Sequence, residues 1–332
     1  MLKINILTYK NYNFFRQAFD YNKYGRIFEY HENSSADIVW DLVVVYENVS
    51  KPVTVKCREG GIIFISGEPP LSKNYPREFL KQFDFVITTH KNIRHNNFVN
   101  SQLGLNWHYG LSHETKLTRY SFEDLESLKR PSKPKLISVI TSSKEMMPGH
   151  NYRIKIIQRL KEDFSDYIDF YGKGSNFIDC KSDAINPYKF HICMENTMVN
   201  HYWSEKFADP LLGYSVPIYS GCPNISEYFD TKGFFIFDMK NYNSIREVIE
   251  RILKNPEKVY EECFDSLEKN RDLLLHKYTI FDVINTFIAQ LTISASIKEV
   301  SIKPYESCRF YKELYYIMAL KRRLLKFIIR IR

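Results

Sequence analysis

Short apolar runs separated by polar or helical segments recur along the chain, a pattern typical of layered α/β proteins. Four such runs are predicted strands of a first sheet: Ile4–Thr8, Leu42–Tyr46, Ile62–Ser66 and Phe85–Thr88. Glycine and proline turn signals flank the third run, with Gly60-Gly61 before it and Gly67-Glu68-Pro69-Pro70 after it. The pattern predicts a first α/β domain over residues 1–127.

A second α/β set follows residues 128–135, a proline-rich basic stretch without periodicity that we predict to be a linker. Its expected strands are Leu136–Thr141, Tyr167–Tyr171, Phe190–Met194, Val216–Ser220 and Phe234–Phe237, and its expected helices are Asn151–Lys161, Ser204–Leu212, Ser244–Leu253 and Pro256–Leu275. The second domain is predicted over residues 136–292, before a helical tail at 293–332. Two nucleotide-fold-like lobes predict an intervening cleft, with ligands at the carboxyl ends of the strands.

Basic residues gather at the end of the sequence. Residues 309–332 contain eight basic side chains and one acidic side chain, so nearly all of the formal net charge of +8 lies there. The nearly neutral remainder argues against a nucleic-acid-binding face. From Phe310 to Arg332, apolar and basic residues alternate near helical spacing, which predicts a basic amphipathic helix on an anionic membrane surface. The alternative is a terminal helix packed on the first lobe, with solvated cations.

The cysteines and the first residues indicate a compartment. Six scattered cysteines form no C-x-x-C pair, which favours free thiols in a reducing environment. The N-terminal residues resemble one short strand rather than a signal peptide, and no stretch of about 20 apolar residues could span a bilayer. We therefore expect a cytoplasmic protein, held peripherally on the inner face of the cytoplasmic membrane.

Polar residues that could take part in binding or catalysis follow the predicted strand Phe190–Met194. Glu195-Asn196 stand at its carboxyl end, and a helix begins at Ser204-Glu205-Lys206. A helix N-terminus favours an anion, so Lys206 in the first turn opposes the helix dipole. A neighbouring pyrophosphate would resolve that conflict. The alternative is a solvated surface lysine, with Glu205 in an ordinary capping role.

Glu68 is a candidate in the first lobe. It follows a buried strand and a glycine and precedes two prolines, an arrangement that would hold one carboxylate at the cleft rim. It could instead merely cap a turn, and His90, His108 and His113 are alternative bases. The chain contains no Asp-x-Asp pair of the kind that holds a divalent ion on a diphosphate, so we predict no metal requirement.

The run Tyr-Lys-Phe … Glu-Asn … Tyr-x-x-Glu-Lys … Val-Pro-Ile-x-x-Gly, from Tyr188 to Gly221, resembles the donor-binding signature of glycosyltransferase family 10, the α-1,3/1,4-fucosyltransferases, in its bacterial type. Met194, Thr197 and Ser204 replace the usual Phe, Ser and Thr. In place of the acidic and aromatic residues that usually precede the helix in this signature, the chain has Asn200-His201-Tyr202.

The resemblance implies roles for individual residues. Lys206 would neutralise the diphosphate and Glu205 would bind the ribose. Glu195, Asn196 and Tyr202 would belong to the donor site, with the last two contacting sugar or phosphate. Arg153 would grip a phosphate and stabilise the leaving group. Glu68 would be the general base of an inverting displacement.

The resemblance also implies the whole activity. It indicates a GT-B-like enzyme that transfers L-fucose from GDP-fucose, with inversion, onto a hydroxyl of a cell-surface glycan such as lipopolysaccharide O-antigen, including lipid-linked acceptors. No cofactor or metal is expected. One alternative keeps the mechanism with another nucleotide-activated sugar. The other is a non-catalytic glycan- or nucleotide-binding scaffold.

Overall fold

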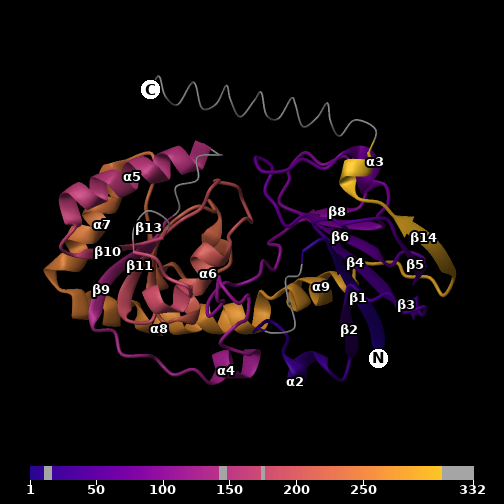
Figure 1. Cartoon of the computed structure of the whole chain (residues 1–332), viewed down its shortest axis with the longest axis horizontal. Coiled ribbons are helices and arrows are strands. Elements are labelled where there is room, and N and C mark those ends of the chain that lie inside the picture. Colours follow the sequence, from indigo (N-terminus) through magenta and orange to yellow (C-terminus); the bar gives the residue numbers. More distant parts are fainter. Residues whose placement is uncertain (11–16, 142–147, 173–175, 309–332) are drawn as a thin grey trace. The chain divides into compact units, whose positions relative to one another are not determined.

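The computed structural model describes residues 1–10, 17–141, 148–172 and 176–308, which form two compact units (Figure 1). Unit 1 comprises Met1–Gly104 together with residues 280–308, and unit 2 comprises Leu105–Thr279. The predicted amphipathic helix at Phe310–Arg332 lies outside the described residues.

Unit 1 is built on a six-stranded parallel sheet in the order β2-β1-β4-β6-β7-β8. All residues of β4, β6 and β7 are buried, which explains their unbroken apolar sequences. The strands are β1 (Leu2–Thr8), β2 (Phe28–Glu32), β4 (Leu42–Tyr46), β6 (Ile62–Ile65), β7 (Phe85–Thr88) and β8 (Phe98–Asn100).

A three-stranded sheet completes unit 1 and incorporates the second stretch of chain. β14 (Ile297–Ile302) pairs antiparallel with β5 (Val53–Arg58), which pairs with β3 (Val39–Trp40). The helices are α2 (Tyr21–Tyr24), α3 (Arg77–Leu80), α9 (Ile280–Ile288) and the 3-10 turn η4 (Tyr305–Ser307). The predicted helical tail therefore begins with a strand that belongs to unit 1.

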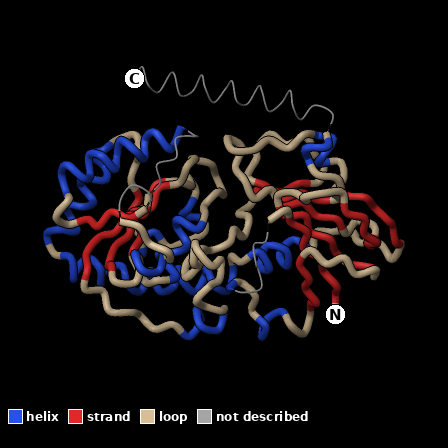
Figure 2. The backbone as a smooth tube through the Cα atoms, viewed as in Figure 1, coloured by secondary structure: helices blue, strands red, loops and turns tan. Residues whose placement is uncertain are grey.

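Unit 2 is built on a five-stranded parallel sheet in the order β10-β9-β11-β12-β13. Figures 1 and 2 show helices packed around this sheet. The strands are β9 (Lys135–Ile140), β10 (Ile168–Tyr171), β11 (Tyr188–Met194), β12 (Val216–Ser220) and β13 (Phe235–Ile236). The helices are α4 (Phe122–Ser127), α5 (Pro148–Phe164), α6 (Glu205–Leu212), α7 (Tyr242–Lys254) and α8 (Pro256–Lys277), with 3-10 turns η1 (Lys181–Ala184), η2 (Ile225–Glu227) and η3 (Thr231–Gly233).

The two parallel sheets confirm the predicted α/β class, but the units divide differently from the predicted domains. Residues 128–135 belong to unit 2 rather than linking two domains, and the segment is anchored there at Lys133 and Leu128. Lys133 is only 7% exposed, and its Nζ donates to the Ile185 carbonyl at 3.2 Å. The hydroxyl of Tyr214 donates to the Leu128 carbonyl at 2.9 Å. Among the described residues, no helix has the length and apolar character needed to cross a bilayer.

Candidate functional site

The carboxyl end of β11 presents Glu195 and Asn196, as ligand-binding α/β sheets commonly do. The Glu195 N–H donates to the Ser220 carbonyl at 2.9 Å, which extends the pairing between β11 and β12 by one residue. Glu195 is completely buried. Its carboxylate is therefore available to neighbouring side chains rather than to solvent.

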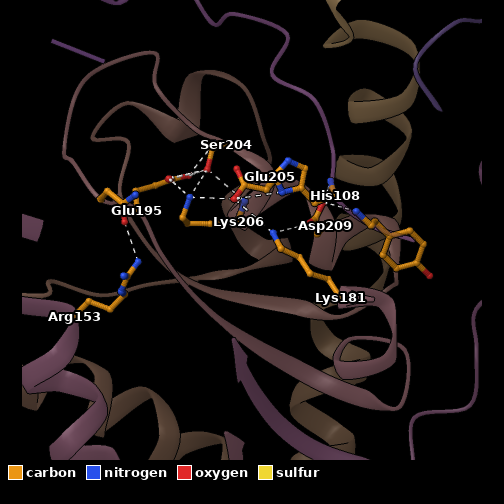
Figure 3. Close-up of polar contacts among 10 residues, drawn as sticks. His108, Arg153, Lys181, Glu195, Ser204, Glu205, Lys206 and Asp209 are labelled. Carbon is orange, nitrogen blue, oxygen red and sulfur yellow. Dashed lines mark hydrogen bonds and ion pairs between the residues drawn. The ribbon is translucent and has the colours of Figure 1, made fainter. Parts of the chain in front are cut away.

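Ser204 joins this strand end to the start of α6 (Figure 3). The Ser204 N–H donates to Glu195 Oε1 at 2.7 Å, and its hydroxyl lies 2.8 and 2.7 Å from the two carboxylate oxygens. The same Ser204 oxygen accepts the Lys206 N–H at 3.4 Å, as an N-cap side chain does. The first turn of α6 is thus fixed to the end of β11.

Lys206 lies between two carboxylates. Its Nζ is 3.1 Å from Glu205 Oε1 and 3.6 Å from Glu195 Oε2, and its side chain is 25% exposed. Burial lowers the pKa of Lys206, but Glu205 and Glu195 outweigh this effect, and the net shift is upward. Burial raises the pKa of Glu195, and Lys206 opposes that rise. These acidic neighbours offset the conflict between the Lys206 charge and the helix dipole.

A second cation holds Glu205 from its other side. Lys181 Nζ lies 3.4 Å from Glu205 Oε1 and 2.9 Å from Asp209 Oδ2. Burial raises the pKa of Glu205, but Lys206, Lys181 and His108 lower it well below its usual range. Asp209, one turn along α6, also accepts the backbone N–H groups of His108 (2.8 Å) and Tyr109 (3.0 Å). Sequence reasoning missed Lys181 and Asp209, because neither belongs to a recognisable spacing pattern.

Arg153 of α5 reaches the same edge of the sheet. It is 6% exposed, and its Nη1 donates to Asn196 Oδ1 at 2.8 Å. Burial lowers the pKa of Arg153, whereas the charge of Glu195 raises it. Figure 3 shows Arg153 and Lys206 both close to the end of β11 that carries Glu195. The structure therefore brings the predicted donor residues of unit 2 together, and Tyr202 lies half-buried two residues before Ser204.

Glu68 lies in unit 1, half-buried in the loop that follows β6. Burial and the nearby Glu47 raise the pKa of Glu68, whereas Ser72, Lys10 and Lys73 lower it. His90, one of the alternative bases, also belongs to unit 1, and its Nε2 lies 3.0 Å from the Glu68 carbonyl oxygen. The other two belong to unit 2: His108 Nδ1 lies 4.0 Å from Glu205 Oε1, and His113 follows five residues later.

The described residues contain no group of three or more His, Cys, Asp or Glu side chains that could hold a metal ion. The cations around Glu195 and Glu205 come from lysine and arginine. This arrangement can bind an anion through charge-assisted hydrogen bonds.

Comparisons with known proteins bear on unit 2. Residues 130–281 match the family described as glycosyltransferase family 10 (fucosyltransferase) C-term, which confirms the predicted resemblance over this segment. The chain is 34% identical over 70 residues to an alpha-(1,3)-fucosyltransferase FucT of Helicobacter pylori, and 26% identical over 102 residues to alpha-(1,3)-fucosyltransferase B of Drosophila melanogaster. These matches cover 21% and 30% of this chain, but only 15% and 23% of the relatives.

Solved structures that cover most of the chain include a fucosyltransferase. The crystal structure of an alpha1,3-fucosyltransferase with GDP superimposes with a TM-score of 0.50 at 18% identity, covering 85% of this chain and 92% of that one. A likeness at this identity concerns the fold, and it agrees with the predicted GT-B-like class.

Proposed function

We propose that this chain is an inverting glycosyltransferase that moves L-fucose from GDP-fucose, since residues 130–281 match the C-terminal model of glycosyltransferase family 10. One observation carries the proposal: Arg153 and Lys206 meet at the carboxyl edge of the unit 2 sheet, around Asn196 and Glu195. The similar alpha1,3-fucosyltransferase with bound GDP supports the choice of nucleotide.

On the donor side, the task of unit 2 is to hold the departing diphosphate. As the bond from the anomeric carbon to the phosphate oxygen breaks, negative charge grows on GDP, and Arg153 and Lys206 stabilise it. Lys206 turns from Glu205 toward the phosphate. Lys181 keeps Glu205 in place, so that its carboxylate can accept hydrogen bonds from the ribose hydroxyls. Glu195, which is fully buried, positions Ser204 and Lys206.

On the acceptor side, Glu68 accepts the proton of the attacking hydroxyl. The acceptor oxygen forms its bond to the anomeric carbon while the bond to phosphate breaks, and GDP leaves with that electron pair. Replacing Glu68 by Gln should lower kcat by roughly a hundredfold to ten-thousandfold and leave GDP binding unchanged. If the chain were instead a non-catalytic glycan- or nucleotide-binding scaffold, the Glu68→Gln variant would behave like the wild type.

Thermal shift assays test the nucleotide. A ligand of the native state at a hundred times its Kd adds about 2.7 kcal/mol of stability, so GDP should raise Tm whereas UDP, CMP and dTDP should not. Lys206→Met and Arg153→Met should lose the GDP shift, and the exposed Lys232→Met in the same unit should keep it. A shift with UDP alone, followed by a matching product mass in a donor screen, would assign a different sugar nucleotide.

Metal independence is part of the proposal, because lysine and arginine supply the charge at the site. Activity should survive EDTA. Loss of activity on chelation, restored by Mn²⁺, would contradict this.

The acceptor is proposed to be a hydroxyl of a cell-surface glycan such as lipopolysaccharide O-antigen, in an α-1,3 or related linkage. The basic sequence of Phe310–Arg332 favours peripheral attachment to the inner face of the cytoplasmic membrane, where lipid-linked acceptors would lie. Deleting these residues should move the protein from the membrane pellet to the supernatant. Unchanged pelleting would exclude this segment as the anchor.

A further inference from the structure

A buried carboxylate, Glu47, lies close to the loop of Glu68 in unit 1. Glu47 directly follows β4, the neighbour of β6 in the sheet, and its N–H donates to the Ile65 carbonyl at 2.8 Å. Glu47 and Glu68 therefore leave the sheet from adjacent strands at its carboxyl edge. Glu47 is only 2% exposed, and Lys10 Nζ lies 3.9 Å from its Oε2.

The backbone around Glu47 is adapted to this carboxylate. Glu47 has a φ of +64°, in the left-handed region that non-glycine residues rarely adopt. A Cβ on Gly67 would stand 2.2 Å from Glu47 Cγ, so the residue before Glu68 must be glycine for the Glu47 side chain to fit. Strained backbone at a buried charged residue points to a functional constraint.

Tyr305 and Glu306, near the end of unit 1, contact residues next to Glu47 and in the loop of Glu68. Asn48 Nδ2 donates to Glu306 Oε2 at 2.8 Å, and the Tyr305 N–H donates to Asn48 Oδ1 at 3.0 Å. The Tyr305 ring lies under the Lys73 ammonium, which is 4.4 Å from the ring centroid. The segment of Tyr305 and Glu306 thus contacts both Asn48, which follows Glu47, and Lys73 in the loop of Glu68.

A cavity that a ligand could enter lies next to Lys10, the cation near Glu47. Tyr9 and Lys10 line a cavity of about 770 Å³ within unit 1, and Lys10 is the residue that approaches Glu47. The Lys10 side chain is half exposed. A charged neighbour and a nearby cavity favour a functional role for Glu47 over a role in packing alone.

We propose that Glu47 is a positioning residue for the acceptor reaction, which keeps the Glu68 carboxylate a strong enough base to accept the acceptor proton. This inference rests on the proposed function of Glu68. Two carboxylates at close range disfavour one another's charge, so the proton affinity of Glu68 rises. Lys10 and Lys73 offset part of this repulsion.

The charged and titratable groups facing Glu68 come from several segments of unit 1. They are Lys10 after β1, Glu47 after β4, Lys73 and Tyr75 in the loop of Glu68 itself, and His90 after β7. Glu47 raises the pKa of Glu68, and Lys10 and Lys73 lower it. Removing a group of either sign should therefore move the titration of Glu68 in a direction fixed in advance.

The experiment is the pH dependence of kcat/KM for transfer from GDP-fucose in the full chain. The base works above its pKa, so activity falls on the acidic side. Glu47→Gln should move this acidic limb to lower pH by on the order of one unit, and Lys73→Met should move it to higher pH. Glu78→Gln, which removes an exposed carboxylate of the same unit, should leave the acidic limb unchanged. A purely structural role would lower Tm and activity without moving the limb in opposite directions.

Two further measurements keep the inference testable. If Glu47→Gln folds poorly, Glu47→Asn removes the charge with a side chain that tolerates positive φ. NMR titration of ¹³C-labelled glutamate carboxyls, with the Glu68 signal identified by its loss in Glu68→Gln, reports the pKa without turnover. An unmoved Glu68 titration in a folded Glu47 variant overturns the inference. Wild-type activity in Glu68→Gln overturns the proposed base instead.

Discussion

Lys206 shows what a single residue reveals in sequence and what it hides. Its place in the first turn of α6 was a recognisable conflict with the helix dipole, and the surrounding motif identified Glu195, Asn196 and Glu205 as its neighbours. The partners that hold Glu205 from the other side could not be predicted. Lys181 lies in a separate 3-10 turn, and only the folded chain brings it to α6.

Removing the Lys206 charge should destabilise the protein in a pH-dependent way. Lys206→Met leaves the buried Glu195 carboxylate without its cation, a change that costs about 3 kcal/mol at pH 7.5. The loss should shrink toward pH 5, because Glu195, whose pKa burial already raises, then takes up a proton. Urea unfolding at both pH values measures this. Lys232→Met serves as the surface control, and equal losses at both pH values would contradict the explanation.

At the scale of elements, the parallel strands were predicted well because continuous apolar runs mark buried strands. The expected runs Leu42–Tyr46, Phe85–Thr88 and Val216–Ser220 coincide with β4, β7 and β12. The small sheet of β14, β5 and β3 was missed. β14 alternates exposed and half-buried residues up to the buried Ile302, and it pairs with a strand more than 200 residues away, which no local pattern indicates.

The start of α6 should depend on the hydroxyl at its N-cap. Ser204→Ala removes both the cap and the hydroxyl contacts with Glu195, and should cost about 2 kcal/mol of unfolding free energy. Ser204→Thr keeps the hydroxyl and should remain close to wild type. Chemical unfolding of the two variants decides the matter; equal stabilities would mean that the cap contributes nothing.

At the scale of the whole molecule, the chain enters unit 2 after Gly104 and returns to unit 1 at Ile280. The sequence suggested a boundary at residues 128–135 because proline and basic residues are common in linkers. Those residues instead belong to unit 2, where Lys133 is buried among backbone carbonyls. The crossing at residues 104 and 105 carries no change of composition, so only the contacts of the folded chain locate it.

This organisation predicts which pieces of the chain fold alone. A fragment of residues 105–279 should unfold cooperatively and keep the GDP-induced rise in Tm. A fragment of residues 1–104 should not fold, because it lacks β14 and the aromatic contact of Phe281 with Tyr30, whose rings lie 4.6 Å apart. Circular dichroism during heating tests both fragments. A cooperative transition in residues 1–104 would show that the second stretch of unit 1 is dispensable.

The pairing of β14 with β5 has a mechanical consequence. Tension applied to the end of the chain would load six antiparallel residue pairs lengthwise, so several backbone hydrogen bonds must break together before β14 yields. The force reaches the Tyr305–Ser307 turn before it reaches β14, and this turn contacts Asn48, the residue after Glu47. A tethered C-terminus would thus transmit force first to the part of unit 1 that carries the two carboxylates.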